Sequence, residues 1–461
     1  MDAAYLFAKN FVNIHYADLP SDVVEATKKE VLDTLGVALA GMSEAGLKEL
    51  IDIVIDWGGK GESTIFGCKQ KVPAPSAAQV NATMVHALDF DDVDHNAVMH
   101  PGVVTIPTCL AMGERKGNLN GKEFITAIAI GVDMLCRLGL ATQPGIPNML
   151  TGWHFTTLYG YFGAAGVAGR ILGLNEEQIV NAFGIAYHQC SGNAQSVKDG
   201  GLTKRLGPGF AVRGGITAAL MAEKGMTGAK NSLEGEFGIF KQYHRGNYDA
   251  KALITDLGKQ FRGTNVSIKP YPCCRGIHPS IDAALALVNQ HNIKPEEVQE
   301  VTISVGEGFH SFLCVPQEVK CRPRNPVDAQ FSIPWGVAAA IARRHATMED
   351  FTGAAIRSQD ILEVASKIRA EMDPTLSRSQ EIEPARVKLT TKQGRVYTEQ
   401  VDIPLGSPER PMSFSDCARK FRDCASYPAK KLSGGRIERV IELIEKLEQV
   451  KDIREIIGLM S

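Results

Sequence analysis

The order in which two hydrophobic patterns occur along the chain is the sequence feature that most constrains its fold. Alternating β-branched residues, the pattern of strands, are concentrated in the segments 298–305, 385–391 and 396–403. On both sides of this block, apolar residues recur every three or four positions, as in 22–41 and 435–459, which is the spacing of helices. The chain is therefore expected to begin and end in helices, with most of its strands between them.

This order predicts two domains. A length of 461 residues exceeds what one hydrophobic core usually organises, about 250–300 residues. We expect a predominantly α, α+β fold in which residues 1–259 and 404–461 form a large all-α helical domain. Residues 260–403 would form a smaller α+β lid domain inserted into it, and a cleft between two such domains is a favoured place for a ligand. Helices are expected at 22–41, 76–88, 101–116, 122–138, 156–172, 176–187, 210–224, 280–289, 330–344, 360–372 and 435–459.

Composition excludes several classes of function. The formal charge is −2 and no basic block is present, so the chain lacks the electrostatic footprint of nucleic-acid or membrane-surface binding. The ten cysteines form no Cys-x-x-Cys pair, and the charged N-terminal segment lacks the apolar region of a signal peptide, so we expect a cytoplasmic protein. The most apolar stretches, such as 124–135, are too short to span a membrane, and Asp133 interrupts this one.

Residues 86–102, HALDFDDVDHNAVMHPG, are the segment that looks least like ordinary packing. Acids and imidazoles crowded together repel one another, lose solvent and shift their pKa values, so such a cluster usually has a functional reason. A helix expected just after His100 would add free N–H groups and a positive dipole end, which favour a bound anion. We interpret this segment, called the acidic turn below, as one wall of an active site. Its acids and histidines are Asp89, Asp91, Asp92, Asp94, His86, His95 and His100.

Three further segments combine reactive side chains with Gly or Pro turns beside an expected helix. They are TGWH at 151–154, DGGLTKRLGPG at 199–209 and KPYPCCRGIHPSID at 269–282. Three of the four segments place His, Lys or Arg immediately before a helix, an arrangement suited to capturing a carboxylate or phosphate. Any one of them is a weak signal, and their repetition predicts a site for a small anion.

Structural explanations of the same residues stay open. A histidine at a helix start, such as His100 or His154, is more often a cap than a catalyst. Lys204 and Arg205 alone would most often be a solvated pair. A helical interaction scaffold without chemistry is therefore one alternative.

A metal site is the second alternative. Asp89, Asp91, His95 and His100 could hold a divalent ion, because carboxylate and imidazole together suit several metals, and the chain would then be a metal-dependent hydrolase. No familiar metal-binding spacing supports this set, and the adjacent cysteines at 273 and 274 lack the two-residue spacing of zinc sites. The glycine-rich segment 200–209 contains neither a Walker A nor a Rossmann motif.

At these segments the chain resembles the MmgE/PrpD family, which includes 2-methylcitrate dehydratase, cis-aconitate decarboxylase and iminodisuccinate epimerase. The matching pieces occur in the family's order, and the resemblance extends from Asp22 to the last helix. The resemblance implies a large all-α domain, a smaller α+β lid, a homodimer, and catalysis without a metal or an organic cofactor. The matching pieces are the acidic turn, TGWH, LTKRLGPGFAVRGG at 202–215, KPYPCCRGIHPSIDAA at 269–284 and RPRNPVDAQFSIPW at 322–335.

Carried onto this sequence, the family's active-site positions fall on Asp89, His100, His154, Lys204 and Lys269. One departure is visible: Val93 stands where the decarboxylase branch has threonine, and the loop to His100 is one residue longer. The dehydratase branch has Thr-Trp after its acidic run, and that pair is also missing. The shared machinery is thus expected, whereas the particular reaction is not determined by these residues.

The expected chemistry passes through negative charge that develops beside a carboxylate. Cationic side chains can stabilise such charge while a positioned acid or base moves protons. His100, His154 and Lys269 are the candidates for proton transfer, with Asp89 orienting a histidine or acting as an acid. The residues expected to bind the substrate's carboxylates are Lys204, Lys269, Arg205 and Arg275, with His278 and Tyr271 as further contacts.

We therefore expect a cofactor-independent lyase or isomerase of a small di- or tricarboxylate. A 2-methylcitrate dehydratase-like hydro-lyase is the first interpretation, and decarboxylation of cis-aconitate or epimerisation of iminodisuccinate are the alternatives. A homodimer is expected, with no nucleic acid and no membrane as partner.

Overall fold

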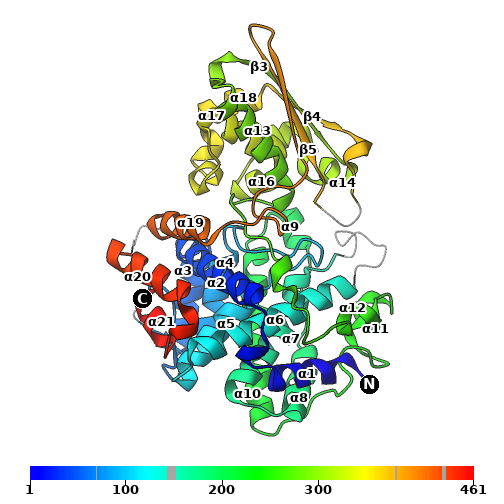
Figure 1. The fold of residues 1–461 in the computed structure, drawn as a ribbon, viewed down its shortest axis with the longest axis vertical. Coiled ribbons are helices and arrows are strands. Elements are labelled where there is room, and N and C mark those ends of the chain that lie inside the picture. The colour runs from blue at the N-terminus through cyan, green and yellow to red at the C-terminus, as the bar shows by residue number, and fades with distance from the viewer. Residues whose placement is uncertain (69, 143–151, 379–381, 428–431) are drawn as a thin grey trace. The chain divides into compact units, whose positions relative to one another are not determined.

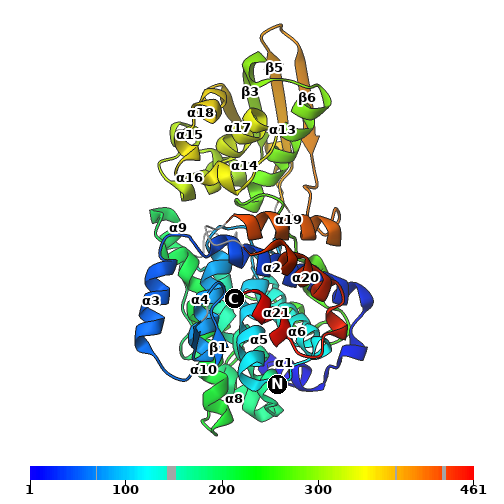
Figure 2. The same cartoon turned by 90° about the vertical axis from the view of Figure 1, so that its left-hand side faces the viewer.

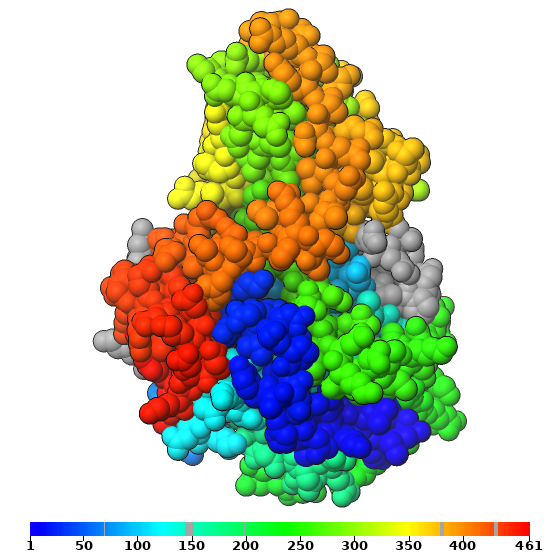
Figure 3. Space-filling view, in the orientation of Figure 1, coloured from blue at the N-terminus to red at the C-terminus, as the bar shows by residue number. Residues whose placement is uncertain are grey.

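The computed structural model describes residues 1–68, 70–142, 152–378, 382–427 and 432–461. Within them the chain divides into two compact units. Unit 1 comprises Met1–Ile268 and Ser413–Ser461, and unit 2 comprises Lys269–Met412. Both termini lie in unit 1 (Figure 1), and the space-filling view shows the blue N-terminal and red C-terminal residues on the surface of that one unit (Figure 3).

Unit 1 is a helical bundle with one short antiparallel strand pair, in which β1 (Ser63–Thr64) pairs with β2 (Lys71–Val72). Helix α7 lies centrally in the bundle and packs against α5, α6, α8 and α10. The helices of unit 1 are α1 (Ala3–Asn13), α2 (Ser21–Gly41), α3 (Leu47–Trp57), α4 (Ala74–His86), α5 (Gly102–Lys116), α6 (Gly121–Ala141), α7 (Phe155–Leu172), α8 (Glu176–Tyr187), α9 (Gln195–Asp199), α10 (Thr203–Glu223), α11 (Ile239–His244), α12 (Ala250–Ile254), α19 (Phe414–Ser426), α20 (Gly434–Glu445) and α21 (Arg454–Leu459).

Small residues let these helices approach closely. A Cβ placed on Gly166 of α7 would lie 2.4 Å from the ring of Phe11, and one on Gly215 of α10 would lie 2.6 Å from the carbonyl oxygen of Tyr161. Since a packed interior has no free space at these points, glycine is required there. The small-residue helices therefore form a tight bundle.

Helix α6 differs from the prediction that the apolar stretches are too short to span a membrane. It is 21 residues long and apolar enough to pass a length-and-composition test for a span, but 94% of its most apolar window is buried inside the protein. Two of its charged residues, Asp133 and Arg137, form a fully buried ion pair of 2.8 Å. Arg137 also donates to the carbonyl oxygens of Thr255 and Gln260. Helix α6 is thus the core helix of unit 1.

Two boundaries in unit 1 were predicted wrongly. Helix α10 begins at Thr203, seven residues before the expected start, because Gly207 and Gly209 permit close packing inside the helix instead of forming a turn: a Cβ on Gly209 would lie 2.7 Å from the carbonyl oxygen of Gln79. The expected helix 435–459 is broken between α20 and α21. There the amide of Gly121 donates to the Val450 carbonyl at 2.8 Å, and this docking to the start of α6 overrides helix propensity.

Unit 2 is an α+β unit built on a four-stranded sheet of order β4-β3-β5-β6, with β4 parallel to β3 and the other pairs antiparallel. Helices α13 and α17 lie on one side of the sheet in both views (Figure 1 and Figure 2), and their apolar faces form its core with the fully buried Trp335. The strands are β3 (Val298–Val305), β4 (Ile368–Met372), β5 (Ala385–Thr391) and β6 (Val396–Val401), and the helices are α13 (His278–Gln290), α14 (Glu307–Phe309), α15 (Gln317–Cys321), α16 (Pro326–Gln330), α17 (Ile333–Arg343) and α18 (Gln359–Ala365).

The expected helix 360–372 is wrong in its second half. Helix α18 ends at Ala365, and Ile368 pairs with Val301 as the first residue of an edge strand. The edge of β3 needs hydrogen-bond partners, and this tertiary pairing overrides the helical spacing of the sequence. The predominantly α, α+β fold class is confirmed.

Candidate active site

The acidic turn connects α4 to α5 and is held in shape by two pairs of backbone hydrogen bonds. The amides and carbonyls of Asp94 and Met99 bond reciprocally at 2.8 and 3.1 Å, and those of Val93 and Ser267 at 2.9 and 2.8 Å. Asp89 adopts φ 53°, a left-handed conformation that aspartate tolerates better than most residues. All four aspartates of the turn are buried. Such buried acids need compensating partners.

His86 and His100 supply partners for one of these acids. The Nδ1 atom of His86 lies 2.7 Å from Asp91 Oδ2, and the Nδ1 atom of His100 lies 3.3 Å from the same oxygen. The two imidazole rings meet edge to face, with centroids 5.0 Å apart. One carboxylate oxygen is therefore shared between two histidines that lie 14 positions apart in the sequence.

Burial and charge set the protonation states of this group. Burial lowers the pKa of His86 to about 4, although Asp91 opposes that shift. Burial alone would raise the pKa of Asp91, but the adjacent His86 and His100 rings hold it well below its usual range. At neutral pH the acid is thus ionised and His86 is a neutral hydrogen-bond donor.

His154 completes a row of three imidazoles. Its ring centroid lies 5.5 Å from that of His86, and its Nδ1 atom lies 2.7 Å from Thr157 Oγ1. Burial, with the nearby histidines and Lys204, lowers the pKa of His154 well below its usual value. His154 occupies the N-cap position of α7 but its side chain makes no capping hydrogen bond. The capping explanation of this residue is therefore not supported.

Lys204 approaches the turn from the first helical residues of α10. Its Nζ atom forms an ion pair of 2.5 Å with Asp89 Oδ1. The prediction that a cation stands just before the helix is wrong for Lys204, which lies one residue inside it. The structure does bring together four of the five predicted catalytic residues: Asp89, His100, His154 and Lys204 all belong to unit 1 and border the acidic turn.

The N-terminus of α5 is occupied by a side chain of the protein. The amide of Gly102 donates to Asp92 Oδ2 at 3.0 Å, and a Cβ on Gly102 would lie 2.7 Å from Asp92 Oδ1. Burial, together with Asp91, raises the pKa of Asp92, and burial also raises that of its neighbour Glu30. The Gly102 amide at the start of this helix is thus engaged by Asp92, a side chain of the protein, and is not free for a bound anion.

Arg205 serves a different part of unit 1. Its guanidinium donates to the Ala45 carbonyl at 3.0 Å and lies 3.6 Å from Glu44. The side chain is mostly buried in this arrangement, which connects α10 to the segment between α2 and α3. Its charge is balanced there without a substrate.

The remaining predicted residues belong to unit 2. Arg275 donates to the Leu405 carbonyl and to Ser407 Oγ, both at 2.7 Å, and lies 2.8 Å from His278 Nδ1. Tyr271 donates to Asp282 at 2.6 Å and packs edge to face on His278. Arg275 therefore holds the segment 404–407 within unit 2, with His278 beside it. Lys269 is the first residue of that unit. Of the TGWH segment, Thr151 lies outside the described residues.

The residues proposed as metal ligands are not grouped as expected. Among the described residues, the set whose ligand atoms lie within 4.8 Å of one another is His86, Asp91 and His100, without Asp89 or His95. The 2.7 Å separation of His86 Nδ1 and Asp91 Oδ2 is that of an N–H···O hydrogen bond. A proton thus explains the contact between these two atoms.

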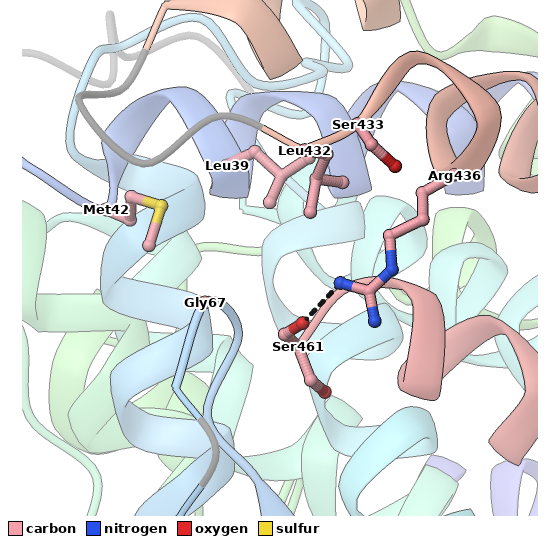
Figure 4. A pocket seen from close by; sticks show the side chains of 7 residues that line it. All are labelled: Leu39, Met42, Gly67, Leu432, Ser433, Arg436 and Ser461. Carbon is pink, nitrogen blue, oxygen red and sulfur yellow. Dashed lines mark hydrogen bonds between the residues drawn. The ribbon is translucent and has the colours of Figure 1, made fainter.

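A cavity of about 200 Å³ elsewhere in unit 1 contains none of the predicted site residues (Figure 4). Arg436 points into it and donates to the Ser461 carbonyl group at 2.7 Å. This arginine is thus engaged by the C-terminal residue. The cavity's lining residues are Leu39, Met42, Gly67, Leu432, Ser433, Arg436 and Ser461.

Sequence reasoning placed His86 and Asp91 in the acidic turn, and Asp91 among the alternative metal ligands, but gave neither a catalytic or substrate-binding role. The signal was present, because His86 ends a helix and Asp91 follows five residues later, but the sequence did not reveal that His100 returns to the same oxygen. Thr156 was also missed: its hydroxyl accepts from the His100 amide at 3.0 Å and connects the turn to α7.

Buried imidazoles beside a carboxylate and a lysine form a site that can transfer protons next to a bound anion, as a lyase or isomerase requires. Models of the MmgE/PrpD N-terminal and C-terminal domains match residues 6–251 and 271–453, so the chain belongs to the MmgE/PrpD family. The C-terminal family domain extends past Met412 into α19 and α20, and so does not coincide with unit 2.

Curated relatives match over nearly the whole chain. A cis-aconitate decarboxylase of Aspergillus terreus is 25% identical over 469 residues, covering 97% of this chain and 94% of that protein. The human cis-aconitate decarboxylase is 27% identical, covering 97% and 92%, and the mouse enzyme is 26% identical, covering 94% and 88%. The prediction of a lyase or epimerase of this family is confirmed. These relatives favour the decarboxylase alternative over the dehydratase that the sequence analysis placed first.

Proposed function

We propose that this chain is a decarboxylase of cis-aconitate or a closely similar unsaturated tricarboxylate. The observation that carries the proposal is its full-length similarity to several proteins named cis-aconitate decarboxylase, combined with a buried imidazole and lysine site in unit 1. The reaction removes one carboxylate as CO₂ and adds one proton to carbon, giving methylenesuccinate. The enzyme must therefore stabilise one pair of electrons and supply one proton to carbon.

Loss of the carboxylate on the methylene carbon is the favourable route. The electrons of the broken C–C bond form the new double bond, and the old double bond shifts its electrons to the carbon beside a second carboxylate. The charge there is enediolate-like, whereas loss of the vinylic carboxylate would leave an unstabilised vinyl anion. A cation at that second carboxylate lowers the barrier, since it acts where charge develops.

Lys204 is the proposed cation, and His100 the proposed proton donor. The ionised Asp91, 3.3 Å from His100 Nδ1, stabilises positive charge on that ring. His100 can then deliver a proton to the carbon and regain it from water. His154, held by Thr157, is the neutral hydrogen-bonding group of the site.

Lys269 is proposed as a second cation for the substrate's carboxylates. Chain connectivity supports this. Ser267 pairs with Val93 of the acidic turn, and Lys269 follows two residues later, so the Cα atom of Lys269 lies within about 7 Å of the Cα atom of Ser267. Arg205 and Arg275 are assigned structural roles because their guanidinium groups have partners within their own units. A homodimer and a cytoplasmic location stay predictions, to be checked by light scattering and cell fractionation.

The proposal is tested by offering the purified protein cis-aconitate, 2-methylcitrate and chiral iminodisuccinate separately and recording proton NMR spectra. We expect turnover of cis-aconitate with release of CO₂. Loss of water from 2-methylcitrate, or α-proton exchange of iminodisuccinate, without CO₂ release from cis-aconitate would refute the proposal. The variant His100→Gln should lower kcat on the order of 10²-fold or more. The exposed His188 provides the matched control His188→Gln, which should retain activity.

A further inference from the structure

We propose that Asp91 and His86 are positioning residues that orient the His100 ring and fix which of its nitrogens carries the transferable proton. This inference deepens the proposed function, because it assigns roles to two buried residues behind the proposed proton donor. Neither residue is expected to touch the substrate. The arrangement is a row in which His86 holds Asp91 and Asp91 holds His100.

The geometry of one oxygen atom is the basis of the inference. Both histidines direct Nδ1 to Asp91 Oδ2, at 2.7 Å from His86 and 3.3 Å from His100. The side chains of His86 and Asp91 are completely buried, whereas that of His100 is 15% exposed. Only His100, of these three, has a ring that reaches accessible space, so it is the member that can meet a ligand.

Proton accounting defines the tautomers. His86 is neutral and has one N–H, and its contact with an ionised carboxylate requires that hydrogen on Nδ1. Its Nε2 is then a buried lone pair, for which the described residues offer no hydrogen-bond partner. His100 faces the same oxygen through Nδ1, so its Nδ1 also carries hydrogen and its Nε2 is left for proton transfer.

The longer contact fits a resting state. At 3.3 Å the His100 nitrogen lies just beyond the usual hydrogen-bond range, and its geometry does not satisfy a hydrogen bond. Contacts of this kind often tighten when substrate binds. The turn is held on both sides of His100, by the Asp94–Met99 backbone pair before it and by Thr156, which accepts from its amide.

Packing alone does not account for the arrangement of His86, Asp91 and His100. Burying a carboxylate is costly, the more so because its other oxygen, Oδ1, has no hydrogen-bond partner among the described residues, and apolar side chains would fill the same space without that cost. The charged and titratable groups near His100 are Asp91 and His86, His154 at the start of α7, and the ion pair of Lys204 in α10 with Asp89 of the acidic turn. Asp91 is the ionised acid in contact with the His100 ring.

Substitutions separate positioning from structure. Asp91→Asn keeps the shape and removes the charge, so kcat should fall on the order of 10²-fold while KM changes far less, because Lys204 is untouched. The kcat–pH profile of Asp91→Asn should differ from that of the wild type, since the negative charge beside His100 is lost. His86→Leu should lower kcat on the order of 10-fold or more, because the donor that holds Asp91 is lost. His86→Asn, whose amide nitrogen can replace Nδ1 as donor, should recover most of that loss.

Nitrogen-15 NMR of histidine-labelled wild-type protein tests the tautomers without substrate and without any variant. We expect His86 to remain neutral with hydrogen on Nδ1 between pH 6 and 8, and His100 to carry hydrogen on Nδ1. A His86 ring with hydrogen on Nε2, or a kcat–pH profile of Asp91→Asn that superimposes on the wild type, would overturn the inference. Failure of the wild type to decarboxylate cis-aconitate would refute the proposed function. The positions of the His86 and His100 hydrogens, measured by NMR without substrate, would still test the present inference.

Discussion

Replacing Asp94 by asparagine should stabilise the protein in a way that depends on pH. Asp94 is 1% exposed, and its Oδ1 accepts from the Ala97 amide at 3.1 Å. Burial raises the pKa of Asp94 from 3.8 to about 6. The folded protein therefore holds this proton more tightly than the unfolded chain does.

The sign and size of the effect follow from that shift. A raised folded-state pKa contributes stability that is complete below about pH 3.8 and is lost as the pH rises through about 6. At about 1.4 kcal/mol per pKa unit, the total loss in the free energy of unfolding is on the order of 3 kcal/mol. On the order of 1.4 kcal/mol of this loss occurs between pH 5 and pH 8. Asparagine can still accept from Ala97 but has no proton to lose. The free energy of unfolding of Asp94→Asn relative to the wild type should thus increase by about 1.4 kcal/mol from pH 5 to pH 8.

Scanning calorimetry at pH 5, 6, 7 and 8 provides the measurement, because it resolves the unfolding transitions of a protein with two compact units. The exposed Asp56 gives the control Asp56→Asn, whose effect should stay within about 0.5 kcal/mol at every pH. A difference between Asp94→Asn and wild type that is the same at pH 5 and pH 8 would show that burial does not raise this pKa.

Three further outcomes are expected. Lys204→Met should lower kcat/KM of cis-aconitate decarboxylation on the order of 10²-fold, whereas Lys224→Met, at the exposed end of the same helix, should have little effect. Equal activities of the two variants would show that Lys204 does not take part in catalysis. Gly166→Ala should cost about 1–3 kcal/mol of stability, because its Cβ would lie 2.4 Å from the Phe11 ring. The control Gly458→Ala in α21, with open space around its Cβ, should stabilise the protein by up to about 1 kcal/mol. Equal shifts of Tm for the two variants in calorimetry would contradict this. Prolonged dialysis against EDTA should leave turnover unchanged, as the proposed mechanism uses no metal, and a loss restored by one divalent metal would favour the metal-dependent alternative.

Elements specified by local signals were predictable from the sequence. Helix α8 runs over Glu176–Tyr187, as expected, since Asn175 and Gln178 form a capping box at its start. Strands β3 and β5 also have the predicted bounds, because alternating burial along them leaves one register that covers the apolar side chains. In these segments the local preference and the tertiary packing agree.

Elements specified by distant partners were not predictable. Strand β4 exists because β3 offers an open edge, and helix α10 extends back to Thr203 because neighbouring helices accept its glycines. The site shows the same limit: sequence identified the acidic turn, His154 and Lys204 as candidates, but the sharing of Asp91 by His86 and His100 depends on how the turn folds back. A single sequence contains the residues of this arrangement without showing their contacts.

The most direct test of the proposed reaction is the fate of solvent hydrogen in decarboxylation of cis-aconitate in D₂O. The proposed mechanism predicts methylenesuccinate with one deuterium per molecule, on the saturated carbon beside its carboxylate, and one CO₂ released for each substrate consumed. Deuterium on the methylene carbon of the double bond would contradict the allylic route, and consumption of cis-aconitate without CO₂ would contradict the assignment of the chain as a decarboxylase.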